Sequence, residues 1–142
     1  MTTSNAAHAR EYLEAAASLT SPYNVAKFYA PGVVIEEFPN RIAPHGRVRR
    51  AADLRSAYEQ GRQLLKSQGY RVQNIVETGD QVAIELVWTG TLAAPAMNLP
   101  AGTEMKAFVA MFLTFRHGKI VSQRNYDCYP PFETQSDSPV PA

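Results

Sequence analysis

Apolar and polar residues alternate through the second half of the chain, and this pattern predicts strands. In residues 81–92 the even positions from Val82 to Trp88 are all apolar. Alternation with a period of two is typical of a strand that buries one of its faces. Three further segments show related patterns and are also predicted to be strands: residues 70–78, 103–115 and 119–129. The second half of the chain therefore predicts a meander of three or four long antiparallel strands.

The first half of the chain is dominated by helical patterns. Thr3 or Ser4 can cap a first helix, which is rich in the strong helix formers Ala, Leu and Glu. The spacing of apolar residues, with start and stop signals, predicts three helices: one that ends near residue 19, one over residues 23–29 and one from residue 51 to about residue 68. Gly69 is the expected stop of the third helix. A short strand over residues 33–38 lies between the second and third helices.

This order of elements predicts an α+β fold. A long twisted antiparallel sheet with about three helices on one face curls into a cone, or half-open barrel, with the helices on its concave face. Such a cone leaves a cavity between the sheet and the helices. The last ten residues, 133–142, are rich in Ser and Pro and are expected to be a disordered tail.

Composition and charge restrict the classes of partner. The chain has 142 residues, of which 45% are hydrophobic and 19% charged, and this suits one domain with a single core. The formal net charge is +1, from 14 Lys and Arg against 13 Asp and Glu. A balanced charge favours neither nucleic acid nor a membrane as the partner, and it is consistent with a neutral small-molecule ligand.

The sequence carries no signal for disulfides, membrane insertion, metals or cofactors. Cys128 is the only cysteine, and no apolar stretch approaches the ~20 residues needed to span a bilayer. His8, His45 and His117 do not have the spacing of metal ligands, and no nucleotide-binding motif is present. The N-terminal residues do not form a secretory signal. We therefore expect a cytoplasmic protein that uses no metal and no cofactor.

Three stretches of sequence carry a family resemblance. They are AKFYAPGVVIEEFP (residues 26–39), VWTGT (residues 87–91) and MFLTFRHGKIVSQRNYDCYPPF (residues 111–132). With these motifs and this order of elements, the chain resembles the nuclear transport factor 2-like superfamily, and within it the SnoaL-like polyketide cyclases and the ketosteroid isomerase group. The resemblance implies a single domain over residues 1–132. It does not choose a function, because the superfamily contains both enzymes and non-catalytic binders.

The resemblance also implies a role for each face of the sheet. In such proteins the concave face lines a pocket and the convex face often packs a dimer. The residues then expected to face the pocket are Val82, Ile84, Leu86, Trp88, Val109, Met111, Leu113, Gln123, Asn125 and Asp127. The residues expected on the convex face are Ala83, Val87, Ala110 and Phe112, which form a surface too apolar to leave in water. A homodimer through this face is therefore expected.

Asp127 is the candidate catalytic residue. It lies near the end of the last predicted strand, and a carboxylate inside a mostly apolar cone has a raised pKa that suits a general acid or base. In the SnoaL-like cyclases an aspartate low in the pocket performs acid/base chemistry, and Asp127 resembles it in position. The alternative is an aspartate at a strand end that is open to water and bonded to a backbone turn.

The likeness to the ketosteroid isomerases fails at two positions. Their catalytic base is an aspartate just before a proline on the first strand, where this chain has Phe38. Glu37 and Phe38 point to opposite faces, so only one can face the pocket, and burial preference favours Phe38. The position of the isomerases' second aspartic acid matches Met111, which cannot donate a hydrogen bond. Steroid isomerase activity is therefore not expected.

Other side chains are candidates for binding substrate. Asn40, with Arg41, could bind a carbonyl or carboxylate group, or it could only complete a turn. His45 in the same loop could shuttle protons, or it could be an exposed turn residue. The polar-tipped aromatic residues expected near the cavity, each of which could instead belong to the core, are Tyr12, Tyr23, Tyr58 and Trp88. The basic run of Arg47, Arg49 and Arg50 lacks a glycine-rich cradle and is interpreted as a solvated face.

These residues favour a small-molecule enzyme that needs no cofactor. It would transfer protons in a cyclisation, isomerisation or dehydration of an apolar carbonyl compound. Asp127 would be the acid/base, and Asn125, Gln123 and Asn40 would orient the substrate. The wall that keeps water out would consist of Val82, Ile84, Leu86, Trp88, Phe38, Met111 and Leu113. The second hypothesis is a non-catalytic module of the same fold that binds a small ligand or dimerises.

Overall fold

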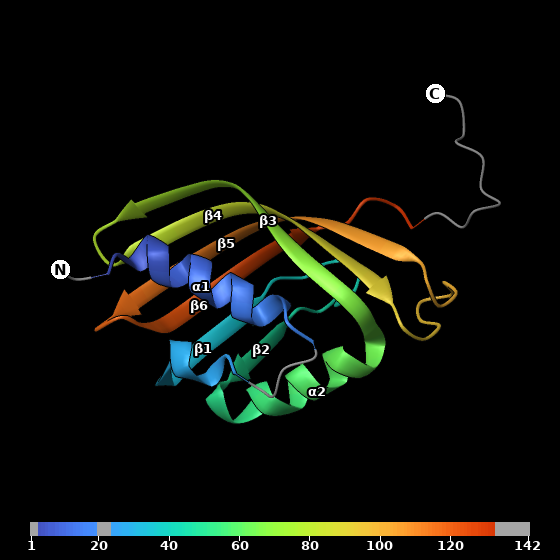
Figure 1. Cartoon of the computed structure of the whole chain (residues 1–142), viewed down its shortest axis with the longest axis horizontal. Coiled ribbons are helices and arrows are strands. Elements are labelled where there is room, and N and C mark those ends of the chain that lie inside the picture. The colour runs from blue at the N-terminus through green and yellow to red at the C-terminus, as the bar shows by residue number, and fades with distance from the viewer. Residues whose placement is uncertain (1–2, 20–23, 133–142) are drawn as a thin grey trace.

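The computed structural model describes residues 3–19 and 24–132 and contains one curved sheet with two α-helices on its concave side (Figure 1). In chain order the elements are α1 (Asn5–Ala17), the 3-10 helix η1 (Ala26–Phe28), β1 (Tyr29–Glu37), β2 (Arg47–Arg50), the 3-10 helix η2 (Ala51–Asp53), α2 (Leu54–Leu64), β3 (Leu65–Thr78), β4 (Gln81–Leu92), β5 (Glu104–Arg116) and β6 (Lys119–Cys128). The strand order is β2-β1-β6-β5-β4-β3, so the sheet is open at β2 and β3. None of the described helices is long and apolar enough to cross a membrane.

The meander predicted for the second half of the chain is confirmed. Strands β3, β4, β5 and β6 pair with one another in sequence, and every pair is antiparallel. Gly79 and Gly118 sit in the tight turns after β3 and β5, with φ of 55° and 75°. This left-handed backbone is open to glycine without a steric penalty, which explains why both turns can be so short.

The first strand makes the sheet mixed, which corrects the expectation of an antiparallel sheet. β1 runs parallel to β6, with Ile35 opposite Gln123 and Glu37 opposite Asn125. The backbone N–H of Phe38 then donates to the carbonyl of Asn125 over 3.1 Å. Alternation along a strand shows which face is buried, and it carries no information about the direction of the neighbouring strand.

Strand β2 was not predicted from the sequence. It pairs antiparallel with β1, so that Arg47 lies opposite Glu37 and Arg49 lies opposite Ile35. The period of two places Arg47 and Arg49 on one face of the sheet and Arg50 on the other. Arg47 and Arg50 are exposed, as the interpretation of this basic run as a solvated face expects, while Arg49 is half-buried. That interpretation did not foresee that Arg47 and Arg49 also line a cavity.

The described residues contain two α-helices, so the expected number of about three is not confirmed. Helix α2 ends at Leu64 because the chain joins the β3–β4 ladder at Leu65, and Gly69 lies within β3 rather than at a helix end. Strand pairing thus overrides helical propensity over residues 65–68. Residues 20–23, where the second helix was predicted to begin, lie outside the described residues, and so does the expected tail over 133–142. The following residues form only η1 before β1 starts at Tyr29.

Helix α1 is held at both ends by side chains of β3. The carboxylate of Glu77 accepts a hydrogen bond from the backbone N–H of Ala6 over 2.8 Å, and the amide of Gln68 donates to the carbonyl of Ala16 over 2.9 Å. Ser4 caps the N-terminus through its hydroxyl, as predicted. These contacts satisfy backbone groups that a helix leaves unpaired at its ends, and the negative charge of Glu77 suits the positive end of the helix dipole.

The core lies between α1 and the concave face of the sheet. Helix α1 contributes Ala9, Tyr12 and Leu13. The sheet residues buried against it are Val82, Ile84, Leu86, Val109, Met111 and Leu113, all of which were expected on the concave face. Large side chains on the convex face are exposed instead, among them Phe108, Phe112 and Tyr126. The alternation in the sequence therefore identified the two faces of β4 and β5 correctly.

Gly90 on β4 provides room for the side chain of Trp88. A Cβ atom at residue 90 would lie 2.5 Å from Cζ2 and 2.7 Å from Cη2 of the indole ring, and 3.2 Å from Cδ2 of Leu65. The indole N–H donates to Oε1 of Gln68 over 2.9 Å, which holds the ring in place. Gly90 therefore positions an aromatic ring that belongs to the cavity wall described below.

We expect Gly90→Ala to lower the free energy of unfolding by about 1–3 kcal/mol, because the added methyl group overpacks the site and pushes the indole off Gln68. Gly61→Ala in α2 is the matched control. Nothing lies within 4 Å of its Cβ position, and alanine should stabilise the helix by up to about 1 kcal/mol. Urea denaturation measures both effects. Equal stability of the two variants would show that Trp88 is not held where the structure places it.

Candidate functional site

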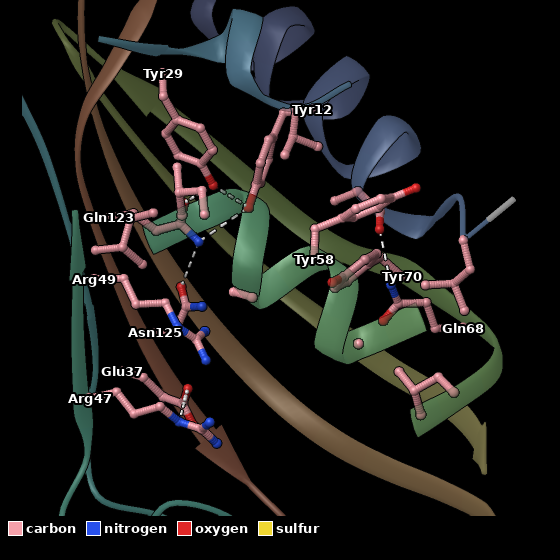
Figure 2. Close-up of a pocket in the computed structure, with 18 residues that line it drawn as sticks. Tyr12, Tyr29, Glu37, Arg47, Arg49, Tyr58, Gln68, Tyr70, Gln123 and Asn125 are labelled. Carbon is pink, nitrogen blue, oxygen red and sulfur yellow. Dashed lines mark hydrogen bonds and ion pairs between the residues drawn. The ribbon is translucent and has the colours of Figure 1, made fainter. Parts of the chain in front are cut away.

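A cavity opens between the two helices and the concave face of the sheet (Figure 2). Its main compartment has a volume of about 310 Å³. The polar residues that line this compartment are Tyr12, Tyr29, Tyr58, Tyr70, Gln68, Gln123, Asn125, Glu37, Arg47 and Arg49. Aliphatic side chains such as Ile35, Leu54 and Leu65 fill the wall between them. A cavity in which polar groups converge between aliphatic side chains is typical of a small-molecule site.

Two adjoining compartments extend this cavity. The side compartment, about 310 Å³, shares Glu37, Arg47 and Arg49 with the main compartment. The inner compartment, about 130 Å³, lies against β5 and β6 and shares four residues with the main compartment: Tyr12, Tyr70, Gln123 and Asn125. Side and inner compartments share three further residues: Trp88, Asp127 and Tyr129. Because every pair of compartments has common walls, we treat them as parts of one cavity.

Four side chains form a hydrogen-bonded network in the main compartment. The Tyr29 hydroxyl donates to the Tyr12 hydroxyl over 2.7 Å and lies 3.0 Å from Oε1 of Gln123. Nε2 of Gln123 lies 3.4 Å from the Tyr12 hydroxyl and 3.3 Å from Oδ1 of Asn125. Gln123 is thus a buried amide with partners for both of its polar atoms. The network orients Asn125 so that its Nδ2, which has no acceptor among the described residues, remains available to a ligand.

Glu37 is held from two sides at the wall between the main and side compartments. Nε of Arg47 lies 3.3 Å from Oε1 of Glu37, and Nδ2 of Asn40 donates to Oε2 over 2.8 Å. The other end of the Asn40 amide accepts hydrogen bonds from the backbone N–H groups of Ile42 and Ala43. Asn40 therefore completes the turn after β1 and positions Glu37, and it lines none of the three compartments.

Asp127 faces the side and inner compartments from the end of β6. No described group donates a hydrogen bond to its carboxylate or forms an ion pair with it. Burial and then the negative charge of Glu37 raise the pKa of Asp127 from 3.8 to about 6, although the positive charge of Arg47 opposes this shift. A carboxyl group that changes protonation near neutral pH can act as a general acid or a general base.

Three tyrosine hydroxyls around Asp127 and Gln123 remain neutral donors. Burial raises the pKa of Tyr70 and of Tyr129, and the charge of Asp127 raises both further. Burial also raises the pKa of Tyr12, against the effect of its hydrogen bonds to Tyr29 and Gln123. Neutral hydroxyls in a partly desolvated cavity can donate hydrogen bonds to a carbonyl or enolate oxygen.

The structure brings many of the candidate residues together around this cavity. Gln123, Asn125 and Asp127 all face it from β6, and three other candidates line it: Trp88, Met111 and Tyr58. Ile84, Leu86 and Leu113 also lie on the concave face, but they belong to the core beneath α1 and line none of the three compartments. Tyr23 lies outside the described residues.

Phe38 does not line the cavity, which reverses the expectation from burial preference. Its ring stacks on Tyr126 on the convex face, with ring centroids 4.4 Å apart and an interplanar angle of 11°. Glu37 therefore points to the cavity. The reason is that Arg47 and Asn40 bind the Glu37 carboxylate and so offset the cost of removing it from water, while Phe38 stacks on an aromatic ring on the convex face.

Two loop candidates are also absent from the cavity wall. His45 is exposed in the loop between β1 and β2 and lines none of the compartments. The guanidinium of Arg41 lies 5.5 Å from the ring centroid of Phe132, near the end of the described chain. The structure therefore gives neither residue a contact with the cavity.

Sequence reasoning missed several residues of the wall, above all Arg47 and Arg49. The signal that could have found them is the alternation of Arg47, Val48 and Arg49, which places both arginines on one face if the segment is a strand. The wall residues Tyr29, Gln68, Tyr70 and Tyr129 carried no signal of their own. Among residues 3–19 and 24–132, no three His, Cys, Asp or Glu side chains are grouped so that they could hold a metal ion.

The raised pKa of Asp127 has a consequence for stability. The folded protein binds a proton at this carboxyl group more tightly than the unfolded chain does, so stability falls as the pH rises from 3.8 to about 6. We expect Asp127→Asn to be more stable than the wild type by about 1 kcal/mol at pH 7.5, after allowance for partial exposure, with the difference vanishing near pH 4. Urea denaturation at both pH values measures this. Asp80→Asn, in the exposed turn after β3, is the control, and a destabilised Asp127→Asn at pH 7.5 would contradict the assignment.

Comparison with known proteins agrees with the fold. The sequence pattern of the SnoaL-like domain matches residues 9–123. AclR from Streptomyces galilaeus, a proposed hydroxylase, superposes with a TM-score of 0.70 at 20% identity, over 87% of this chain and 74% of that one. IdmH from Streptomyces antibioticus, a proposed polyketide cyclase, superposes with a TM-score of 0.70 at 23% identity, over 88% of this chain and 92% of that one.

A SnoaL-like polyketide cyclase from Agrobacterium tumefaciens superposes with a TM-score of 0.65 at 15% identity, over 89% of this chain and 92% of that one. No curated protein matches the chain. Identities this low show a common fold and do not carry an activity from one protein to another. The match to the domain pattern spans most of the chain, from α1 to the middle of β6. The chain therefore belongs to the SnoaL-like domain family, within the nuclear transport factor 2-like superfamily that its sequence resembles.

Proposed function

We propose that this protein is a cofactor-independent enzyme that transfers protons to and from an apolar carbonyl compound, in a cyclisation, isomerisation or dehydration. The observation that carries the proposal is the setting of Asp127. Its carboxyl group faces a cavity, has no hydrogen-bond or ion-pair partner among the described residues, and has a pKa of about 6. A structural carboxylate is normally paired, so an unpaired one in a cavity wall is suited to exchange protons with a ligand.

The side chains next to Asp127 support a carbonyl ligand. Nδ2 of Asn125 and the neutral hydroxyls of Tyr70 and Tyr129 are donors in the walls of the compartments that contain or adjoin Asp127. Donors of this kind stabilise the negative charge that develops on a carbonyl oxygen when a neighbouring carbon loses a proton. Gln123 contributes indirectly, because its amide holds Asn125 in place.

The inner compartment supplies a partly dry environment. Ala107, Val109, Met111 and Trp88 line it together with the polar groups. Exclusion of water strengthens the interaction between Asp127 and a developing charge. The long apolar wall predicted from the sequence is thus replaced by a shorter one, because Ile84, Leu86 and Leu113 lie in the core beneath it.

Exchange of deuterium into 2-tetralone tests proton transfer without knowledge of the natural substrate. Protons beside its carbonyl group exchange with D₂O when a base removes them, and NMR follows both the exchange and the binding. We expect the protein to accelerate exchange, with a rate that rises as Asp127 loses its proton near pH 6 and then levels off. Asp127→Asn should lower the accelerated rate by about 100-fold or more and leave binding nearly unchanged.

Asp80→Asn is the control for this experiment, since residue 80 is exposed in the turn between β3 and β4. Exchange that is the same for the wild type and Asp127→Asn would exclude Asp127 as the base. Binding of the ketone with no accelerated exchange would instead favour the second candidate, a non-catalytic module that binds a small ligand in the same cavity.

We also propose that two copies of the chain pair through the convex face of the sheet. Phe108, Phe112 and Tyr126 are 49%, 36% and 42% exposed there, and Phe112 and Tyr126 form one aromatic cluster with Phe38. Of the residues expected in this interface, Val87 is already 7% exposed in the single chain and has little surface left to bury. An aromatic patch of this kind on a sheet face favours a symmetric dimer.

We expect Phe112→Glu to convert a dimer into a monomer at micromolar concentration, because a charge would be buried within the interface. Light scattering coupled to gel filtration measures the mass. Leu64→Glu is the control, because Leu64 is 37% exposed at the end of helix α2, on the other side of the sheet. A wild-type protein that is monomeric under these conditions would contradict the proposed interface.

A further inference from the structure

Arg49 is a positively charged residue in the cavity wall that has no acidic partner. It is half-buried on β2 and lines both the main and the side compartments (Figure 2). Among the described residues the ion pairs formed by arginines are Arg47 with Glu37 and Arg62 with Glu59. No described group accepts a hydrogen bond from the Arg49 side chain. A guanidinium group that has lost part of its hydration without gaining a counter-charge is suited to bind an anion.

The two carboxylates that line the same compartments as Arg49 do not form an ion pair with it. Both oxygens of Glu37 are occupied, one by Nε of Arg47 and the other by Nδ2 of Asn40. Asp127 makes no ion pair with either arginine. Arg49 therefore forms no ion pair within the wall, and Arg47 adds a second guanidinium group to the same two compartments.

The surroundings of Arg49 favour a carboxylate over a phosphate. The neighbouring wall is formed by Leu54, Ala57, Gly61 and Leu65, and the rings of Tyr58 and Tyr70 line the same compartment. Within residues 3–19 and 24–132, no glycine-rich loop presents backbone N–H groups to this end of the cavity, as phosphate sites generally require. Guanidinium groups bind a planar carboxylate through paired hydrogen bonds, and the aliphatic and aromatic wall suits an otherwise apolar molecule.

We propose that Arg49, assisted by Arg47, binds the carboxylate of an aromatic or alicyclic ligand whose apolar body fills the main compartment. The inference rests on the proposed function and names its substrate class: a carbonyl compound that also carries a carboxylate. The register supports this, since Arg49 lies opposite Ile35 on β1 and Ile35 lies opposite Gln123 on β6. Arg49 is thus two strands, roughly 10 Å, from Gln123, and Asp127 lies four residues, roughly 13 Å, further along β6. The Arg49 and Asp127 side chains both line the side compartment, so a ligand that reaches from one to the other would be elongated, as two or three fused rings are.

Matched pairs of probes test this proposal. Benzoate, 2-naphthoate and anthracene-2-carboxylate are each compared with the corresponding primary amide by calorimetry at pH 7.5. For the wild type we expect at least one carboxylate to bind about tenfold more tightly than its amide, as a charge-assisted pair would provide. Arg49→Gln should abolish this preference while the amide binds as before. Arg50→Gln, which removes the same charge from the opposite face of the same strand, should retain the preference.

The outcomes separate this inference from the proposed function. The anion site would be overturned if the wild type bound carboxylate and amide equally, or if Arg49→Gln and Arg50→Gln lost the carboxylate preference to the same extent. Neither result would contradict the cavity as a binding site or the proposed role of Asp127. Failure of every probe to bind would overturn the cavity as a site for aromatic compounds, and this inference with it. Repeating the comparison in Asp127→Asn keeps the readout independent of catalysis, since the carboxylate preference should persist there.

Discussion

The parallel pairing of β1 with β6 is the constraint on which the whole site depends. It places Glu37 beside Asn125 at the point where both strands reach the cavity, and it lets β2 add Arg47 and Arg49 on the outer side of β1. These four residues of the site thus come from three adjacent strands, in the order β2-β1-β6. Because side chains alternate between faces, a shift of β1 by one residue would replace Glu37 with Phe38 in the cavity and remove the charge beside Asp127.

The electrostatics of the cavity follow from this pairing. Burial raises the pKa of Asp127, the charge of Glu37 raises it further, and the charge of Arg47 limits the shift. Arg47 and Asn40 also make an inward-facing Glu37 tolerable, because they occupy its two oxygens. Two carboxyl groups in one cavity therefore have different environments: one is fixed by partners and the other is unpaired. Separation of roles between neighbouring carboxyl groups is a general way to produce an acid/base at neutral pH.

Most other polar groups in the cavity wall satisfy one another. Tyr12, Tyr29 and Gln123 form a network of hydrogen bonds, and Gln68 bonds to both Trp88 and helix α1. Within the described part of the chain, the groups that face the cavity without such partners include the Asp127 carboxylate, Nδ2 of Asn125, the Arg49 guanidinium and the hydroxyls of Tyr70 and Tyr129. Buried polar groups are normally paired, so a ligand is the natural partner of these groups. They are one acid/base, several neutral donors and one cation, which together suit a carbonyl compound with an acidic group.

The sequence by itself determined the meander, the faces of β4 and β5, the inward row of Gln123, Asn125 and Asp127, and the family, because each of these follows from local alternation or from motifs along the chain. Tertiary structure decided the rest. The direction of β1, the existence of β2, the end of α2 at Leu64 and the choice of Glu37 over Phe38 all depend on contacts between segments far apart in sequence. The candidates Ile84, Leu86 and Leu113 could not be separated from true wall residues because core and cavity share one face of the sheet. The local pattern determines on which face of a strand a side chain lies. Only packing decides which element lies against that face and where a cavity remains between them.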